Sequence, residues 1–260
     1  MKIFLGLPWK NAQILLDFAM KRFFLSTFFL PTLALAAGYQ NPAVSASDIA
    51  TASAGGGSAI ENASAQAYNP ASLARLKGYN FSLGAVGVKH RARFTDSTMP
   101  NLASAWLATG NFYASAEIND SWVVGFSVNQ PFLMENNYDN PWGAGDWTQK
   151  AELSVTQFSP NVAWRIHDKF SLGLGLSYAK AQWRFQNSIF SYDDKDNALG
   201  WNAGILLTPS ETMNVSISYQ SPFHFKGNAW RLKTPAKFTI TTWQELMRGW
   251  ELMGKIEYTK

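Results

Sequence analysis

Apolar residues alternate with small or polar ones along most of the chain. In residues 170–178, FSLGLGLSY, every second position is apolar and the positions between are Ser or Gly. Residues 213–220, MNVSISYQ, and 122–128, WVVGFSV, follow the same pattern closely. Successive side chains of a β-strand point to opposite faces, so a period of two predicts strands with one apolar face and one small or polar face.

The connections between these strands alternate in length. Short polar turns are predicted at 118–122, 166–170, 208–213 and 247–251, and longer connections at about 95–110, 131–148, 187–197 and 228–235. This rhythm indicates a repeated hairpin, with tight turns at one end of the sheet and long loops at the other. We count roughly nine strands, the first at 78–94 and the last reaching Lys260.

Tryptophans gather toward both ends of these strands. Trp122, Trp164 and Trp250 lie near short turns, and Trp106, Trp183, Trp201 and Trp230 lie toward the long loops. Such placement is typical of the two aromatic girdles of an outer-membrane barrel. A secreted β-sandwich also alternates and carries core Trp, but its turns need not alternate in length. We therefore predict an all-β fold, a transmembrane antiparallel β-barrel.

The front of the chain has the parts of a secretion signal. Residues 20–36 combine Lys-Arg, an apolar stretch and an Ala-Leu-Ala cleavage site, and we expect the mature chain to begin at Ala37. Residues 1–19 precede the methionine of that signal, and we expect them to come from an upstream start codon. From 37 to 260 no apolar run reaches the length of a membrane helix, so membrane residence requires a barrel.

The number of strands indicates whether the barrel is complete at the C-terminus. Single-chain bacterial barrels usually close with an even number of strands, and an open edge in lipid is costly. With nine strands predicted, we expect the barrel, residues 78–260, to be incomplete at its C-terminus.

Composition narrows the function classes. The net charge is +4, but four of the 22 basic and one of the 18 acidic residues lie within residues 1–36, so the remainder is nearly neutral. No basic stripe remains for phosphates, which excludes nucleic acid as a partner. The chain has no Cys, and its three His residues lack metal-ligand spacing. No nucleophile–base or phosphate-loop motif stands out, so we expect neither an enzyme nor a cofactor.

Residues 54–76, AGGGSAIENASAQAYNPASLARL, resemble the N-terminal region of the FadL family of outer-membrane long-chain fatty-acid transporters. In that family a small-residue tract precedes an Asn-Pro-Ala motif. Residues 37–40, AGYQ, resemble its mature start, and residues 111–132 and 153–178 resemble its early strands and turns.

The resemblance implies a fourteen-stranded barrel plugged by an N-terminal hatch, here residues 37–77. Hydrophobic substrates are captured by extracellular loops and leave sideways into the membrane lipid through a gap at an inward kink of the third strand. The Asn-Pro-Ala motif lies against that kink, which predicts contact with residues 121–133. We expect a monomer.

The motif corresponds to Asn69, Pro70 and Ala71. Locally it reads as a helix start, because Asn can cap a helix and Pro suits its first position. A role at a lateral gate is the second interpretation, and the two are compatible. The preceding Gly55, Gly56 and Gly57 form either a flexible linker or a tight packing site.

Two places on the third and fourth strands can interrupt pairing. Asn129, Gln130, Pro131 and Phe132 follow the alternating run of the third strand. Because Pro131 has no amide donor, it marks either a kink, and hence a lateral gate, or the start of the loop, which we favour. In the fourth strand the apolar parity changes between Val155 and Phe158, which predicts a bulge at Ser159-Pro160.

The following long loop is rich in apolar residues that would otherwise be exposed. Leu133, Met134, Tyr138, Trp142 and Trp147 form a candidate substrate-capture surface, and the alternative is packing against the barrel rim.

A fatty-acid carboxylate requires a cation, and Arg165, on the polar face of its strand but close to a short turn, is a candidate. We predict uptake of long-chain fatty acids or similar hydrophobic molecules. The alternatives are a structural or adhesive outer-membrane barrel, or a secreted binding sandwich.

Overall fold

A computed structural model of the chain describes residues 44–89, 106–137, 150–187, 191–228 and 230–260. The expected signal, 20–36, therefore lies outside the described residues. A short α-helix and two 3-10 helices precede the strands: α2 (Ala46–Ala50), η1 (Ala63–Ala67) and η2 (Pro70–Arg75). The strands are β1 (Tyr79–Lys89), β2 (Trp106–Asn119), β3 (Trp122–Asn137), β4 (Lys150–His167), β5 (Phe170–Gln186), β6 (Ser191–Ser210), β7 (Met213–Gln220), β8 (His224–Lys226), β9 (Arg231–Lys233), β10 (Lys237–Met247) and β11 (Trp250–Thr259).

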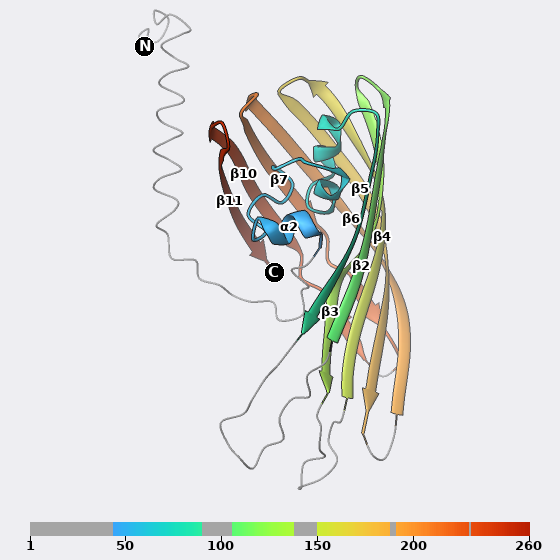
Figure 1. Cartoon of the computed structure of the whole chain (residues 1–260). Helices are drawn as coiled ribbons and strands as arrows, with labels where there is room; N and C mark the ends of the chain where they lie inside the picture. The colour runs from blue at the N-terminus through green and yellow to red at the C-terminus, as the bar shows by residue number, and fades with distance from the viewer. Residues whose placement is uncertain (1–43, 90–105, 138–149, 188–190, 229) are drawn as a thin grey trace, which may run out of the picture. The chain divides into compact units, whose positions relative to one another are not determined.

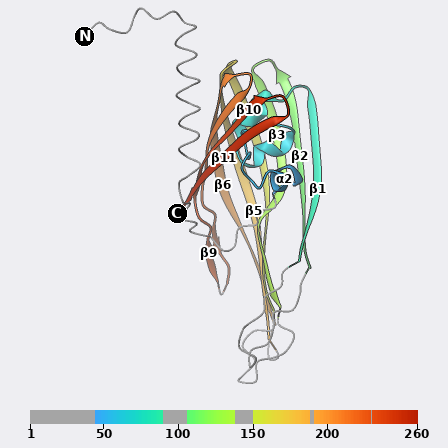
Figure 2. The same cartoon turned by 60° about the vertical axis from the view of Figure 1, so that its left-hand side comes forward.

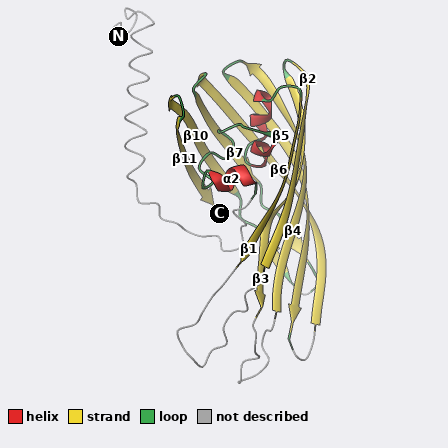
Figure 3. Ribbon diagram, in the orientation of Figure 1, coloured by secondary structure: helices red, strands yellow, loops and turns green. Residues whose placement is uncertain are grey.

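Nine of the strands form one antiparallel sheet, in which chain neighbours are also neighbours in space (Figure 1). Its order is β1-β2-β3-β4-β5-β6-β7-β10-β11. The strands β8 and β9 form a separate two-stranded hairpin inserted between β7 and β10. Short turns join β2 to β3, β4 to β5, β6 to β7 and β10 to β11, as the sequence predicts (Figure 3). Among the described residues, no helix has the length and apolar character needed to cross a membrane.

The two faces of the sheet differ in chemistry. On β5 the buried positions include Ser171, Ser177 and Ala179, while Leu174 and Leu176 are 60% and 68% exposed. The face with buried, mostly small or polar residues is called the inner face below. A sheet that buries serines and exposes leucines reverses the pattern of a soluble protein and matches a wall that faces lipid.

Residues 44–77, called the hatch, pack on the inner face (Figure 2). The hatch is bonded to strands across the sheet. Gln66 Nε2 donates to the carbonyl of Ala114 on β2, at 3.1 Å. Thr241 Oγ1 of β10 donates to the carbonyl of Gly56, at 2.7 Å. A buried apolar cluster that includes Leu73, Tyr113 and Val123 joins the hatch to β2, β3 and β4.

Two strands run further than predicted. The expected loop 187–197 is mostly strand, because β6 begins at Ser191 and pairs with β5 from Gln186 onward. The strand β3 likewise continues to Asn137, inside the expected loop 131–148. Charges on these extensions are compensated by neighbouring strands: Asp193 of β6 lies 3.4 Å from Arg184 of β5, and Glu135 of β3 lies 3.1 Å from Lys150 of β4. Paired charges let a ladder continue beyond its apolar band, and a hydropathy pattern does not reveal this.

Candidate functional site

An apolar cluster occupies the inner face, away from the short turns. Its buried members are Phe132, Leu153, Val155, Ala179, Ala181, Ala198, Phe223 and Phe225, and none is more than 8% exposed. Trp183, Trp230 and Leu232 pack against it. The three alanines lie on β5 and β6, where small side chains leave the volume that two phenylalanine rings fill.

The β8–β9 hairpin brings both phenylalanines to the inner face of β6. The backbone N–H of Phe223 donates to Thr234 Oγ1 at 2.8 Å, which closes the base of the hairpin. At its tip the backbone N–H of Asn228 donates to Asp194 Oδ2 at 2.6 Å, and Asn228 Nδ2 donates to Asp194 Oδ1 at 3.1 Å. Asp194 is 7% exposed, and these bonds compensate for the lost hydration of its carboxylate.

Toward the hatch, the inner face becomes polar within two residues along β4 and β5. Gln157 follows Val155 on β4, and Ser177 precedes Ala179 on β5. Gln157 Nε2 donates to Ser159 Oγ at 2.8 Å and to Ser177 Oγ at 3.0 Å, and the two hydroxyls lie 2.9 Å apart. These three residues, called the polar layer, are each at most 5% exposed. The apolar cluster and the polar layer therefore meet at a boundary about 7 Å, or two residues, wide.

A bulge in β3 lies at that boundary. Asn129 pairs with Gln157 and Phe132 pairs with Val155. Two residues of β3 therefore lie between these pairs where β4 has only one, so β3 carries one inserted residue. The inserted residue reverses which parity of β3 points inward, and Phe132 thereby joins the apolar cluster. Pro131 lies inside the strand at the irregularity, so the favoured prediction, that it begins the loop, is wrong.

The expected bulge at Ser159-Pro160 is also wrong. Phe158 pairs with Tyr178 and Asn161 with Gly175, so equal numbers of residues face each other on β4 and β5. The apolar parity changes for another reason: Leu153 and Val155 point inward into the apolar cluster, whereas Phe158 points outward. When the inner face changes from apolar to polar contacts, the apolar residues of the sequence switch parity just as they would at an inserted residue.

The Asn-Pro-Ala motif starts a helix. Asn69 Oδ1 accepts from the backbone N–H of Ala71 at 2.8 Å, and Pro70 is at the first turn of η2. The other side of the Asn69 amide holds the wall: Nδ2 donates to the carbonyl of Ile205 at 2.9 Å and to Ser216 Oγ at 2.7 Å. Asn69 is fully buried.

The wall receives the motif at two glycines that pair across β5 and β6, Gly173 and Gly204. A methyl group at Gly204 would collide with Asn69 Oδ1, and one at Gly173 would collide with the backbone of Ala71. The structure thus corrects the expected partner of the motif. Its bonds go to β6 and β7 and it packs on β5, whereas the third strand meets the hatch at Gly125, under Gln66 and Leu73.

The glycine tract packs tightly against the wall. Gly57 has a φ of +84°, and a methyl group there would lie 2.9 Å from Ser216 Oγ and 3.0 Å from Asn69 Cβ. The ring of Tyr68 covers Gly56, and its hydroxyl donates to Asp48 Oδ2. Burial, and then the Asp48 charge, raise the pKa of Tyr68 well above its usual value.

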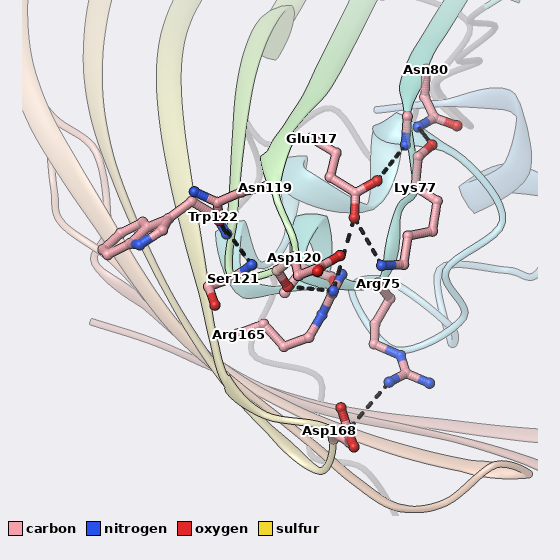
Figure 4. A network of polar contacts seen from close by, with 12 residues as sticks. Arg75, Lys77, Asn80, Glu117, Asn119, Asp120, Ser121, Trp122, Arg165 and Asp168 are labelled. Carbon is pink, nitrogen blue, oxygen red and sulfur yellow. Dashed lines mark hydrogen bonds and ion pairs between the residues drawn. The ribbon is translucent and has the colours of Figure 1, made fainter.

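Arg165 ties the end of the hatch to the short turns (Figure 4). Its Nε donates to the carbonyl of Ala74 at 2.8 Å, and its Nη1 donates to the carbonyl of Asp120 at 2.6 Å. Glu117 lies 3.9 Å from the guanidinium and accepts from Lys77 Nζ at 2.8 Å. The contacts of Arg165 are those of an anchor at the hatch end, far along β4 from the apolar cluster.

The candidate capture surface divides between two kinds of residue. Leu133 and Met134 belong to β3, where Met134 pairs with Leu153. Tyr138, Trp142 and Trp147 lie outside the described residues.

The tryptophan girdle is partly confirmed. Trp122 and Trp164 stack on the outer face with ring centroids 5.4 Å apart. Trp183 and Trp230, expected in the second girdle, turn instead to the apolar cluster, where their rings lie 6.3 Å apart.

Sequence reasoning missed the β8–β9 hairpin and its anchors. Phe223 and Phe225 alternate with polar residues in SPFHFKG, which is a strand signal, but the run is short and begins with a proline. The Asp194 carboxylate had no visible partner in sequence, since Asn228 lies 34 residues away.

The chain matches the model of one protein family over residues 27–257: the outer membrane protein transport protein (OMPP1/FadL/TodX) family. The chain belongs to this family. Members of the OMPP1/FadL/TodX family are outer-membrane transport proteins rather than enzymes, which confirms the predicted family and location.

Several OMPP1/FadL/TodX proteins show sequence similarity. Outer membrane protein P1 of Haemophilus influenzae is 26% identical over 245 residues, covering 72% of this chain and 53% of that protein. The long-chain fatty acid transport protein of Escherichia coli K12 is 23% identical over 247 residues, covering 76% and 55%. The chain thus spans about half the length of the curated relatives it matches.

Solved structures share the fold. A FadL homologue from Pseudomonas aeruginosa superposes with a TM-score of 0.68 at 16% identity, covering 86% of this chain and 70% of that one. The CymD monoaromatic hydrocarbon channel superposes with a TM-score of 0.60 at 12% identity, covering 78% and 65%. These matches confirm the predicted outer-membrane β-barrel fold, and the described residues form nine strands of such a wall.

Proposed function

We propose that this protein takes up long-chain fatty acids or similar hydrophobic molecules across the outer membrane by passive, facilitated diffusion. Family membership supports transport of hydrophobic compounds. The names of similar proteins include both fatty-acid transporters and a monoaromatic hydrocarbon channel. Either substrate needs an apolar place to leave water, and the apolar cluster supplies one.

The observation that carries the route is the bulge of β3 at the boundary between the apolar cluster and the polar layer. A hydrophobic molecule loses favourable burial if it moves on toward Gln157 and Ser177. The bulge interrupts strand pairing beside Phe132, at the level where the apolar cluster meets the polar layer. Lateral release into lipid at Asn129–Phe132 is therefore the proposed exit.

Deleting Gln130 tests the exit. The deletion leaves equal numbers of residues on β3 and β4 between Asn129 and Phe132, so the ladder can close while Asn129 and Phe132 keep their facing. Gln130→Ala is the matched control, because it changes the side chain and keeps the inserted residue. Cells without their own transporter would express each form, and uptake of radiolabelled oleate and toluene would be measured.

We expect the deletion to reduce uptake at least tenfold and Gln130→Ala to retain most of it. Heat-modifiable migration in gels verifies that both barrels fold. Unchanged uptake by a folded deletion variant contradicts the exit at the bulge. A wild-type protein that takes up neither compound contradicts transport itself and leaves a structural or adhesive role.

A further inference from the structure

A small cavity lies within the hatch, and its lining comes entirely from residues 45–68. Its volume of about 20 Å³ is enough for one water molecule or one dehydrated metal ion. The polar side chains around it are hydroxyls, carboxylates and one carboxamide, and they include Asp48, Thr51, Glu61 and Ser64. We call it the Asp48 cavity.

Asp48 brings a buried negative charge to this cavity, since the residue is only 5% exposed. Its Oδ2 accepts hydrogen bonds from Ser53 Oγ at 2.7 Å and from the Tyr68 hydroxyl. Its Oδ1 is buried without a hydrogen-bond partner, and no lysine or arginine of the described residues forms an ion pair with the carboxylate. Lys255 lies 5.2 Å from the centroid of the Tyr68 ring, but it is paired with Glu257 at 3.0 Å. A buried charge without a counterion is costly, so the free oxygen indicates a cationic ligand.

Glu61 adds a second carboxylate to the lining of the Asp48 cavity. It is exposed, and within the described part of the chain its side chain forms no ion pair or hydrogen bond. Thr51 Oγ1 donates its proton to the carbonyls of Ser47 and Asp48, both at 3.2 Å, so its lone pairs stay available to a cation. An exposed carboxylate beside a buried one gives an entering cation a path from solvent.

The donor set and the size of the cavity select among metal ions. Carboxylate and hydroxyl oxygens suit hard cations such as Ca²⁺ and Mg²⁺, whereas Zn²⁺ and Cu²⁺ favour nitrogen and sulfur ligands. Mg²⁺ keeps several of its waters, and a volume of about 20 Å³ does not hold a hydrated ion. Two carboxylates balance the charge of a divalent ion, so Ca²⁺ fits this cavity better than a monovalent cation.

We propose that the Asp48 cavity binds Ca²⁺, with Asp48 Oδ1 and the Glu61 carboxylate as its charged ligands. This site is independent of the transport proposed above. An ion held by Asp48 fixes α2 and, through the hydrogen bond from the Tyr68 hydroxyl, the ring that covers Gly56. Bound Ca²⁺ therefore stabilises the packing of α2 against the glycine tract and η1.

Terbium luminescence tests the site. Tb³⁺ replaces Ca²⁺ at oxygen ligands and emits when a nearby aromatic ring is excited, and the Tyr68 ring lies beside Asp48. Purified protein in a non-ionic detergent, freed of metal with a chelator, would be titrated with Tb³⁺ and then with Ca²⁺ or Mg²⁺ as competitor. Asp48→Asn and Glu61→Gln each remove one negative charge and keep the shape of the side chain. Asp168→Asn is the matched control, since it removes the same charge at the turn between β4 and β5, outside the cavity lining.

We expect wild-type protein to give saturable luminescence that Ca²⁺ displaces at about 10⁻⁴–10⁻³ M, the range of weak extracellular sites, and that Mg²⁺ at the same concentration does not. Asp48→Asn should weaken Tb³⁺ binding at least about tenfold and Glu61→Gln about threefold, while Asp168→Asn leaves it unchanged. Hydrogen exchange of the amides in residues 45–62 should slow when Ca²⁺ is added to the wild type but not to Asp48→Asn.

Two results overturn the site. Luminescence that is absent in the wild type, or that Asp48→Asn and Glu61→Gln leave unchanged, means that the cavity holds water only. Equal displacement by Mg²⁺ contradicts the assignment to Ca²⁺. Heat-modifiable migration verifies that each variant folds, and Glu61→Gln, at the exposed edge of the cavity, decides the question if Asp48→Asn does not fold. Uptake of oleate and toluene is measured separately, so failure of the metal site leaves the transport proposal standing.

Discussion

Replacing Asn69 by Ala should release the hatch from the wall without unfolding the sheet. The substitution removes the bonds from Nδ2 to the Ile205 carbonyl and Ser216 Oγ, and the cap on the Ala71 N–H. All three lie in a site where Asn69 is fully buried, so water cannot replace them while the hatch stays docked.

The magnitude follows from these three groups. Losing an N-cap costs about 1 kcal/mol, and leaving a buried polar partner unsatisfied costs about 1–3 kcal/mol. We expect the substitution to weaken docking of η2 by roughly 3 kcal/mol in total. The total stays below the sum of the upper values because the Ile205 carbonyl can keep other hydrogen-bond partners. At about 1.4 kcal/mol per factor of ten, the undocked population rises roughly a hundredfold.

Hydrogen exchange of the amides in residues 63–76 measures that population directly. We expect their protection to fall by about two orders of magnitude while the strands keep theirs. Gly204→Ala should act alike from the wall side, because its methyl group meets Asn69 Oδ1. Gly110→Ala is the control, since the nearest atom to its methyl group is 4.0 Å away. Unchanged protection of 63–76 in both Asn69→Ala and Gly204→Ala would refute the docking role of the motif.

Three further outcomes test other contacts. Phe223→Ala should loosen the β8–β9 hairpin by about 3–5 kcal/mol, seen as faster exchange across 221–234; no change would mean that the apolar cluster does not hold it. Asp194→Asn should destabilise the hairpin tip by a smaller amount, about 1–3 kcal/mol, since Asn228 keeps neutral hydrogen-bond partners. Faster proteolysis near the tip would report this, and unchanged proteolysis would contradict the role of the Asp194–Asn228 bonds. Arg165→Met should expose residues 74–78 to exchange and leave oleate binding within twofold, and a larger loss of binding would restore its role as a ligand.

The sheet was predictable because its signal is local. Each strand carries its own alternation, and each short turn carries its own polar residues, so residues 170–178 suffice to predict β5. The helix start at Asn69 was predictable for the same reason, as its cap joins groups two residues apart. The Nδ2 group of the same Asn69 amide bonds Ile205 and Ser216, which lie 136 and 147 positions further along the chain. No local sequence pattern reveals contacts at such separations.

Parity arguments failed where the inner face changes its contacts. Alternation reports which side of a strand is apolar, and it identifies a face only if one face stays apolar throughout. On β4 the inner face is apolar at Val155 and polar at Gln157, so the sequence imitates a bulge that does not exist. On β3 an inserted residue does exist, but Pro131 made the end of the strand the simpler interpretation.

The two errors have one physical origin, and it bears on how the molecule works. A wall whose inner face were polar throughout would show regular alternation, as in a water-filled pore. Here the inner face is apolar beside the β8–β9 hairpin and changes to the polar layer at Gln157, and the bulge of β3 lies where the two regions meet. A hydrophobic molecule gains by burial up to that level and gains nothing beyond it, while the lipid outside the wall remains as apolar as the cluster. Under the uptake proposed above, the interruption in pairing thus lies at a level of β3 where sideways movement costs less than onward movement.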